Sequence, residues 1–538
     1  MFGFGQFAPR RWMSLGAFAL LLGVGPAAAM AAVTATGDFN PNPLVDGESL
    51  SIGFNAYGTF RIDGGSSFES NFVEAGDEPS GFGVATVTDP GSKWTFFGGT
   101  FGDRGYGRLE ILNGGVVEIP NANILAFGGN SGNGRGTAIV DGDGSLLHVY
   151  APLQIGTSGA GTMRIADGAI VNVPEYETTI GNRGRIELDG GLFRTSRLEG
   201  NGVISGSGQI DVTSCCGQEY GGRIEVGAGE ELRISHFSNS EVRNFGEINI
   251  EGGQLEFGNF LVNERVGDRS GQIQLNDGTL RAGPIGGGNF DAVYRNRGLV
   301  TTIGGVNHLY GTLRNESGSD VAVVNKSMLM LHNDVVADFD STISVFAGST
   351  AVFLQDLRLN GGTLLADLAG VDGYGHVEVV GDVFLNGQLQ VNLSNGYLPQ
   401  LGDSFQLLSG AGSVNGSLEL SPTAPLPTGL EWDVVIGAGS VVLSVISDLE
   451  GDYNGDGSVD AADYTVWRDT LGSGSELAAD GNGNQRVDAG DYAVWKANFG
   501  STLGSGSAQS LQAVPEPATC LMFALAIACW LPASRRPR

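Results

Sequence analysis

The chain is poor in lysine and in charged residues generally. Its 538 residues carry a formal net charge of −30, only 16% are charged, and lysine occurs only at Lys93, Lys326 and Lys496. A chain this acidic lacks the basic surface that nucleic acids and anionic membranes attract, so we expect neither as a partner. Such acidity is typical of a protein that stays soluble outside the cell.

Cysteine and histidine are also scarce. Cys520 and Cys529 lie near the C-terminus and the other two cysteines are the neighbours Cys215 and Cys216, so we expect no disulfide framework. A bridge between adjacent cysteines would be strained, and two small residues in a turn are the simpler interpretation. The histidines show no zinc-binding spacing; they are His148, His236, His308, His332 and His376.

Glycine, in contrast, is abundant, with 89 residues, and it recurs within a repeated pattern. The clearest copy is GRLEILNGGVV at residues 107–117. Copies recur about every 25 residues, which is typical of a repeat architecture. They begin at Gly58, Gly83, Gly107, Gly136, Gly161, Gly184 and Gly208, then out of register at Gly222, Gly246, Gly271 and Gly298, and more weakly at Gly362 and Gly387.

Each copy reads as a short strand followed by a turn. Leu109 and Ile111 alternate with polar residues, which places them on one face of a strand. The step Asn113-Gly114-Gly115 suits a turn, because glycine and asparagine readily adopt positive φ. One short strand cannot bury its apolar face alone, so the copies must stack. We therefore expect a mainly β protein built on a β-solenoid, a right-handed parallel β-helix because crossovers favour that hand, with a β-sandwich array as the alternative.

The flanking segments have a different character. Residues 1–32 carry Arg10-Arg11, an apolar run and then small residues, which is typical of a secretory signal peptide; the arginine pair suits either the general or the twin-arginine route. We expect the solenoid at 33–395. A proline-bearing segment at 396–447 is the expected C-terminal cap, because an open solenoid end exposes unpaired strand edges.

The glycine-rich units resemble a known class of repeat. The stretch Ile155–Gly168, IGTSGAGTMRIADG, has the form shared by type V autotransporter passengers and PEP-CTERM proteins, and the resemblance covers roughly residues 50–195. It implies an extracellular β-helical stalk or adhesin-like passenger.

Two acidic loops follow the solenoid. Residues 452–463 have oxygen-bearing side chains at positions 1, 3, 5, 9 and 12 and Gly457 at position 6, as an EF-hand calcium loop does, except that position 12 is Asp463. The pattern recurs 28 residues later, at 480–491. Position 7 of such loops binds through its backbone carbonyl. The predicted calcium ligands are Asp452, Asn454, Asp456, Ser458, Asp460, Asp463, Asp480, Asn482, Asn484, Arg486, Asp488 and Asp491.

Each loop leads into a short helical pattern. The two apolar sets correspond, and glycine ends each helix in the C′ position. They are Tyr464, Trp467, Leu471 and Gly472, matched by Tyr492, Trp495, Phe499 and Gly500.

This duplicated loop and helix, residues 448–500, resembles a type I dockerin. The resemblance implies two bound calcium ions and docking onto a cohesin-like partner. Ala461-Ala462 and Ala489-Gly490 stand where a Ser-Thr recognition pair is common, which leaves open a calcium-stabilised module without a partner.

The two loops differ in charge. The first has four aspartates, whereas the second has three aspartates and Arg486, giving formal charges of −4 and −2. The second also has Gln485 where glycine is expected. Because affinity follows ligand charge and site rigidity, we expect the first loop to bind calcium more tightly.

A linker at 501–513 precedes a tripartite tail at 514–538. Val514-Pro515-Glu516-Pro517 is followed by an apolar run at 518–531 and a final arginine cluster. That run would reach about 21 Å as a helix, short of a bilayer core. The tail resembles a PEP-CTERM sorting signal, which implies transient membrane contact, recognition by an exosortase and a Gram-negative-type envelope. An anchoring helix is the alternative.

Two function classes remain. The first is a non-catalytic exported protein of the cell surface or extracellular matrix, with an extracellular polysaccharide as a second candidate partner. The second is a polysaccharide-active β-helix enzyme, a lyase or glycosidase carrying a dockerin. Asp141-Gly142-Asp143 is the nearest candidate for paired carboxylates, but it occupies a turn position, so we predict no catalytic residues.

Overall fold

The structure is a computed structural model that describes residues 32–503 except 121–122, 130–131, 215–217, 237–240, 259, 284–292, 411 and 422–423. The chain divides into two compact units, residues 1–321 and 322–538, which are described separately. Residues 1–31 of the predicted signal peptide, the sorting tail, nearly all of the linker and the four cysteines lie outside the described residues. Within the described part, no helix is long and apolar enough to cross a membrane.

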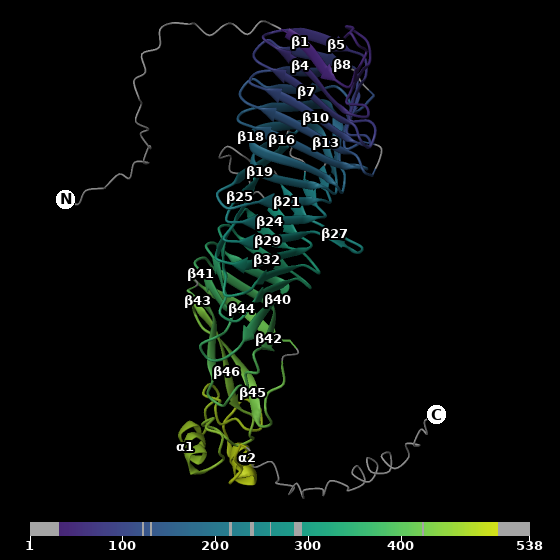
Figure 1. The fold of residues 1–538 in the computed structure, drawn as a ribbon. Helices are drawn as coiled ribbons and strands as arrows, with labels where there is room; N and C mark the ends of the chain where they lie inside the picture. Colours follow the sequence, from purple (N-terminus) through teal and green to yellow (C-terminus); the bar gives the residue numbers. More distant parts are fainter. Residues whose placement is uncertain are drawn as a thin grey trace, which may run out of the picture. The chain divides into compact units, whose positions relative to one another are not determined.

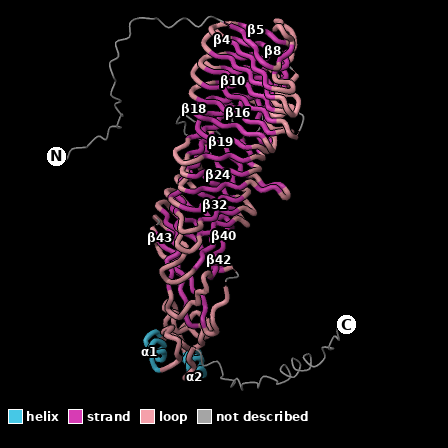
Figure 2. The backbone as a smooth tube through the Cα atoms, in the orientation of Figure 1, coloured by secondary structure: helices cyan, strands magenta, loops and turns pink. Residues whose placement is uncertain are grey.

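The first unit is a β-solenoid in which three strand columns stack coil upon coil (Figures 1 and 2). Parallel pairing joins the strands within each column, as each register shows. The first column contains β4 (Tyr57–Asp63), β7 (Phe82–Thr88), β10 (Tyr106–Leu112), β13 (Arg135–Asp141), β16 (Ala160–Ala166), parts of β18 (Gly184–Gly200) and β19 (Val203–Val212), β21 (Arg223–Val226), β24 (Glu247–Glu251), β29 (Gln272–Asn276) and β32 (Leu299–Gly304).

The other two columns complete each coil. The second contains β5 (Ser67–Ser70), β8 (Lys93–Phe96), β11 (Val116–Ile119), β14 (Leu146–Val149), the start of β17 (Ile170–Ile180), β22 (Glu231–His236), β25 (Gln254–Phe257), β30 (Thr279–Ala282) and β33 (Val306–Tyr310). The third contains β3 (Leu50–Ile52), β6 (Val73–Ala75), β9 (Gly99–Phe101), β12 (Leu125–Phe127), β15 (Leu153–Ile155), β20 (Gln218–Tyr220), β23 (Val242–Asn244), β26 (Leu261–Asn263), β31 (Val293–Asn296) and β34 (Thr312–Asn315).

Three antiparallel pairings depart from this pattern. At the start of the unit, β1 (Ala32–Gly37) runs antiparallel to β4, and β2 (Phe39–Asn40) antiparallel to β3. Further along, β27 (Arg265–Val266) and β28 (Arg269–Ser270) form a hairpin that projects from the coils (Figure 1).

The repeat glycines align from coil to coil as the sequence predicts. Gly107 pairs with Gly83 on one side and Gly136 on the other. A Cβ atom on Gly107 would lie 2.2 Å from the backbone nitrogen of Gly102 and 2.3 Å from the carbonyl oxygen of Ala75, so only glycine fits there. The glycine of the repeat is therefore a consequence of close backbone packing between adjacent turns.

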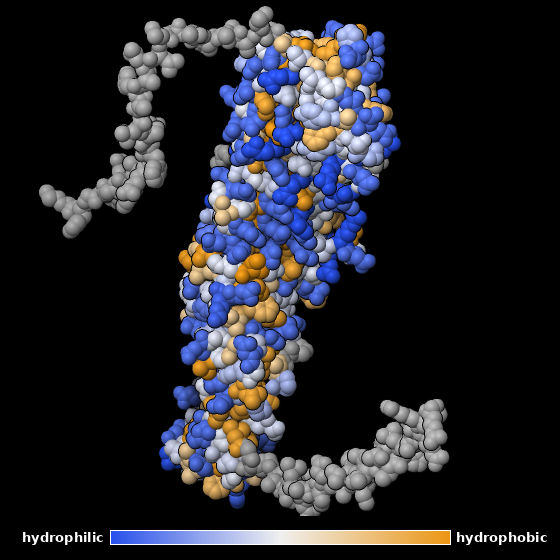
Figure 3. Space-filling model, viewed as in Figure 1, coloured by the Kyte–Doolittle hydropathy of each residue, from blue (hydrophilic) through white to orange (hydrophobic). Residues whose placement is uncertain are grey.

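The alternating residues build the expected interior. Leu109, Ile111 and Ile165 are fully buried. Asn113 has φ of 50° and Gly114 has φ of 84°, which confirms the predicted turn. On the face drawn in Figure 3, hydrophilic residues cover most of the first unit, as this alternation requires. The predicted mainly β solenoid, of about 13 turns, is confirmed, and its right-handed winding stays a prediction.

One predicted repeat start is wrong. Gly208 pairs with Gly191 and Leu232 in the second column, whereas the coil begins where Val203 pairs with Arg185 and Arg223. This coil and the one before it are both shorter than the coils on either side of them, and the two short coils explain the break in register at Gly222. The strands β35 (Asp320–Val323) and β39 (Thr350–Phe353) also lie where no glycine-marked copy was found, because they begin after Ser319 and Ser349 and not after glycine.

Four buried asparagines form a ladder along the first unit. The side-chain amide of Asn244 donates to Asn263 (2.9 Å), that of Asn263 to Asn296 (2.9 Å), and that of Asn296 to Asn315 (2.8 Å). All four are at most 3% exposed. Their polar groups are satisfied by one another, so a polar column lies within the apolar core.

The second unit contains stacked strands and two helices. β36 (Met328–Leu331), β39 and β41 (His376–Val379) form one parallel series, and β37 (Val335–Asp338), β38 (Thr342–Val345), β40 (Leu357–Leu368), β42 (Val383–Leu393) and β44 (Val414–Leu420) pair as others. In the segment predicted as a cap, β46 (Ser440–Ser447) runs antiparallel to β43 (Ser404–Ser409) and β45 (Leu430–Ile436). The helices are α1 (Ala461–Thr470) and α2 (Ala489–Asn498).

Candidate calcium-binding module

The aspartate at position 1 of each loop organises the turn that follows it. In the first loop, the Asp452 carboxylate accepts hydrogen bonds from the backbone N–H groups of Asp456 (3.2 Å) and Gly457 (2.8 Å). The Asn454 side-chain oxygen also accepts from the Asp456 N–H, at 2.9 Å. These bonds curl the loop, and the side-chain amide of Asn454 donates to the Asp456 carboxylate at 2.9 Å.

The aspartate at position 12 closes the loop from the helix. The Asp463 carboxylate accepts from the backbone N–H groups of Asn454 (3.0 Å) and Asp460 (2.7 Å). Asp463 is the third residue of α1, and its bond to the Asp460 N–H forms a capping box with the Asp460 side chain. Loop and helix are therefore locked together by the same carboxylate.

The second loop repeats these bonds one for one. The same four bonds reappear at positions shifted by 28 residues, and a second capping box joins the loop to α2. Asp480 accepts from Asn484 (3.0 Å) and Gln485 (2.7 Å), and Asp491 accepts from Asn482 (3.1 Å) and Asp488 (2.6 Å).

The position 12 aspartates are fully buried carboxyl groups. Asp463 and Asp491 are both 0% exposed, and no described lysine, arginine or histidine forms an ion pair with either. A buried carboxylate without a cation is costly. Each loop otherwise offers only oxygen donors, the set that calcium prefers. The residues present therefore fit a calcium ion, which would supply the missing positive charge.

The carboxylates do not complete such a site alone. Among the described residues, no group of three or more Asp, Glu, His or Cys side chains is arranged to hold a metal ion. The amide oxygens at position 3 and the backbone carbonyls of Ser458 and Arg486 at position 7 would have to contribute, as in EF-hand loops.

The two loop–helix units are joined by reciprocal hydrogen bonds. The indole N–H of Trp467 on α1 donates to the Asp488 carbonyl of the second loop, and that of Trp495 on α2 donates to the Asp460 carbonyl of the first, each at 2.8 Å. Each helix therefore fixes position 9 of the opposite loop. A small core of Tyr453, Ala479 and Val487 lies between them.

Position 2 breaks the symmetry. It is Tyr453 in the first loop, whose hydroxyl donates to the Asp491 carbonyl at 2.6 Å. In the second loop it is Gly481, where an added Cβ would lie 2.4 Å from that hydroxyl. Burial, together with the nearby carboxylates of Asp491, Asp463 and Asp480, raises the pKa of Tyr453 to about 12. The phenol therefore remains neutral and able to donate at neutral pH.

Gln485 adopts the left-handed backbone conformation that glycine favours. Gln485 has φ of 66° and Gly457, at the same position in the first loop, has φ of 87°. The second loop therefore follows the same path as the first although it lacks the glycine. A non-glycine residue in this region costs roughly 1 kcal/mol.

The helix ends also agree with the sequence. The helices end before Gly472 and Gly500, whose φ values of 93° and 90° suit the C′ position. The capping boxes and the crossed tryptophan bonds were missed. The aspartates at positions 9 and 12 have the spacing of a capping box, which is the signal that could have shown it.

Comparison with known proteins supports the module and says little about the solenoid. Residues 450–500 match the model of the dockerin type I domain. The protein is thus a β-solenoid protein with a dockerin type I domain near its C-terminus.

The relatives found by sequence are uncharacterised. The chain is 29% identical over 184 residues to the Escherichia coli (strain K12) protein YuaQ, covering 32% of this chain and 13% of YuaQ. It is 25% identical over 314 residues to the E. coli lipoprotein YdeK, covering 49% of this chain and 22% of YdeK. The matched regions are therefore small parts of both relatives.

Two solved structures show only a distant likeness. The TibC-catalysed hyper-glycosylated TibA fragment is 14% identical, with a TM-score of 0.25, covering 70% of this chain and 94% of that one. The Haemophilus influenzae Hap adhesin is 11% identical, with a TM-score of 0.23, covering 72% and 58%. Scores this low do not establish a shared fold or role.

Proposed function

We propose that this is a non-catalytic exported protein of the cell surface or extracellular matrix, in which a β-solenoid scaffold carries a calcium-stabilised docking module at 448–500. The observation that carries the proposal is the bond-for-bond duplication of two oxygen-lined loops. Each loop ends in a fully buried aspartate, Asp463 or Asp491, that lacks a described ion-pair partner. Calcium binding at both loops gives these carboxylates a counter-charge.

A partner surface is available on the helices. Tyr464, Leu471 and Phe499 are 36%, 53% and 57% exposed. Ala461 and Ala462, at the positions that commonly recognise a partner, are also exposed. Exposed apolar side chains of this size on one small module provide a candidate interaction surface. We therefore propose a cohesin-like partner whose contact surface is apolar where a standard cohesin would meet Ser-Thr.

The solenoid acts as a scaffold in this proposal. Asp141, the nearest candidate for catalysis, forms an ion pair with Arg164 (3.2 Å), which also pairs with Asp189 in the next coil (2.6 Å). This bridge between coils supports a structural role. Incubation with polysaccharides and assay of reducing ends or unsaturated products tests the enzyme alternative; any turnover would refute the non-catalytic assignment.

The docking proposal is tested on the full secreted chain. Hydrogen exchange followed by mass spectrometry should show residues 452–500 strongly protected with calcium and rapidly exchanging with a chelator, while the first unit is unchanged. A purified type I cohesin domain, presented with and without calcium, then tests docking. Hydrogen exchange that is the same with and without calcium would contradict the calcium proposal. If calcium protects the module but the cohesin domain does not bind, the module is a stabilising one without this partner.

A further inference from the structure

One corner of the solenoid is elaborated in a way that the repeat does not require. In the coils around it, the asparagine ladder residue is separated from the coil glycine by one residue: Phe245 between Asn244 and Gly246, and Arg297 between Asn296 and Gly298. In the coil between them, Asn263 and Gly271 are separated by residues 264–270. These six extra residues form the β27–β28 hairpin.

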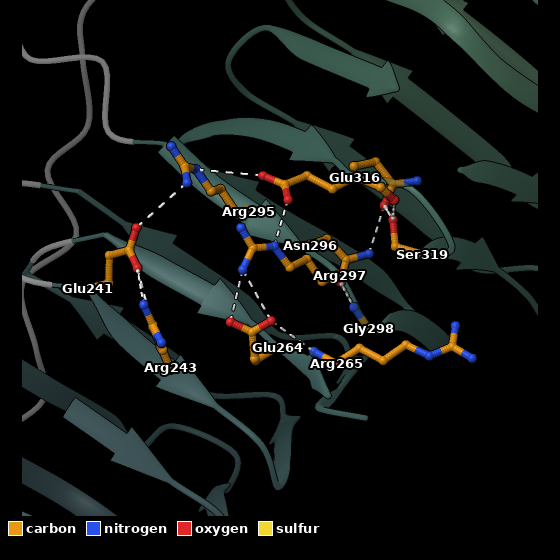
Figure 4. Close-up of polar contacts among 11 residues, drawn as sticks. Glu241, Arg243, Glu264, Arg265, Arg295, Asn296, Arg297, Gly298, Glu316 and Ser319 are labelled. Carbon is orange, nitrogen blue, oxygen red and sulfur yellow. Dashed lines mark hydrogen bonds and ion pairs between the residues drawn. The ribbon is translucent and has the colours of Figure 1, made fainter. Parts of the chain in front are cut away.

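The base of this hairpin is anchored by charge (Figure 4). Glu264 is 4% exposed and accepts two hydrogen bonds from the Arg297 guanidinium, at 3.0 and 3.2 Å. Arg297 also pairs with Glu316 at 2.6 Å. Arg265 donates to the Gly318 carbonyl at 2.7 Å. The base of the hairpin is therefore fixed on the side of the later coils, and its tip projects from them.

A groove of about 550 Å³ runs beside the hairpin over successive coils. Its floor is formed by Gly221, Gly222 and Gly246, which carry no side chains. Only glycine fits at position 246, because an added Cβ there would lie 1.9 Å from the Gly222 carbonyl oxygen. One wall is formed by Arg223, Glu247 and Gln272, which pair in register across three coils. The groove is thus trough-shaped, and its lining side chains recur at the strand spacing, about 4.8 Å.

The other wall is formed by the hairpin and one aromatic ring. Asp268 and Arg269 at the hairpin tip line the groove, and both are exposed. Phe245 also lines it, directly after β23 (Val242–Asn244), whose last residue belongs to the ladder. The trough therefore offers one apolar ring face among amide and charged groups.

The geometry points to an uncharged polysaccharide chain as the ligand of this groove. The charges along the trough cancel, with Arg223 and Arg269 opposed by Glu247 and Asp268, and the net charge of −30 repels an acidic polymer. An open polar trough suits an extended hydroxyl-rich chain, whose sugar ring can place its C–H face on Phe245. The site adds a ligand to the proposed extracellular role and does not depend on the docking module.

The test measures binding by the full secreted chain. We expect retardation in native gels that contain xyloglucan, galactomannan or mixed-linkage β-glucan, and none in gels that contain alginate. Phe245→Ala should weaken binding about tenfold, as for loss of one stacking contact. Phe82→Ala, at an exposed ring stacked on Tyr106 outside the groove, is the matched control and should leave binding unchanged.

A second variant removes the wall. Deletion of residues 265–270 restores the one-residue spacing between Asn263 and Gly271, retains Glu264, and should abolish retardation while the circular dichroism spectrum stays that of the parent. If the deletion misfolds, Asp268→Ala with Arg269→Ala replaces it and should weaken binding. Binding to alginate alone, no binding to any of the three neutral polymers, or binding unaffected by Phe245→Ala would overturn the inference. Calcium-dependent exchange of the module should be unchanged in every variant.

Discussion

The solenoid and the terminal module bury polar groups in opposite ways. In the first unit, the buried amides of Asn263 and Asn296 are satisfied by neighbouring asparagines of the same chain. In the module, the buried carboxylates of Asp463 and Asp491 receive backbone hydrogen bonds but no counter-charge from described residues. The ladder amides of the first unit are thus satisfied by residues of the same chain, whereas a bound cation would supply the counter-charge that the module's carboxylates lack.

The largest expected effect is the loss of stability when a charge is placed in the solenoid interior. Ile111→Asp places an unpaired charge in a fully buried column and should destabilise the fold by more than about 4 kcal/mol. Glu110→Ala, one residue earlier on the outer face, removes surface contacts with Arg108 and Thr86 and should cost less than about 1 kcal/mol. Denaturant midpoints of the two variants should differ accordingly; similar midpoints would contradict the interior column.

The next effect sharpens the contrast at the module. Asp463→Ala should remove the first calcium site and leave the second, and Asp491→Ala the reverse. Because the first loop carries four aspartates and the second three with Arg486, the first site should be the tighter. Calorimetric titration of the full chain with calcium should resolve two unequal sites in the parent and one in each variant. Equal affinities would show that loop charge does not control binding here.

The asparagine ladder provides the corresponding test in the first unit. Asn296→Ala leaves the Asn263 amide and the Gly298 N–H without their acceptor and should cost about 1–3 kcal/mol. Asn201→Ala, at an exposed asparagine, is the control and should be nearly neutral. The loss of stability in Asn296→Ala should be the same with and without calcium, whereas the stability of the module should depend on calcium. If the loss of stability in Asn296→Ala depended on calcium, the solenoid and the module would not be energetically independent.

The sequence predicts those features that each repeat specifies locally. The copies from Gly58 to Gly184 and both acidic loops could be identified because their glycines and aspartates recur at fixed spacing. The short coil that begins near Val203 could not, because its length is set by pairing with neighbouring strands. The asparagine ladder and the anchored hairpin are also contacts between coils. An Arg-Asn step that recurs at three of the four ladder positions, as at Arg243-Asn244, was the available signal.

A smaller effect on calcium affinity is expected when the residues at position 6 are exchanged between the two loops. Gln485→Gly relieves a residue with φ of 66° and should stabilise the second loop by roughly 1 kcal/mol, or about fivefold in calcium affinity. Gly457→Gln should weaken the first loop by a similar amount, because φ there is 87°. The two changes should therefore narrow the difference between the sites. Titration of the single and double variants tests this, and an unchanged second site in Gln485→Gly would show that the turn carries no strain.

The smallest effect concerns an acidic cluster on the first unit. Burial raises the pKa of Glu74, and the carboxylates of Asp77 and Asp103 raise it further. The charged form is therefore disfavoured in the fold, so its destabilising contribution is present above the folded pKa and disappears as the pH falls to the unfolded value. Glu74→Gln should raise the melting temperature slightly at pH 7 and leave it unchanged near pH 4.

Asp77→Asn is the matched comparison for Glu74→Gln. Burial also raises the pKa of Asp77, but Arg104, whose guanidinium lies 3.8 Å from the Asp77 carboxylate, opposes that rise. Removing the Asp77 charge therefore also removes an attraction, and its gain at pH 7 should be smaller than that of Glu74→Gln. A loss of stability at pH 7 in Glu74→Gln would show that the carboxylate is held by favourable contacts and that the cluster, like the asparagine ladder, is satisfied within the chain.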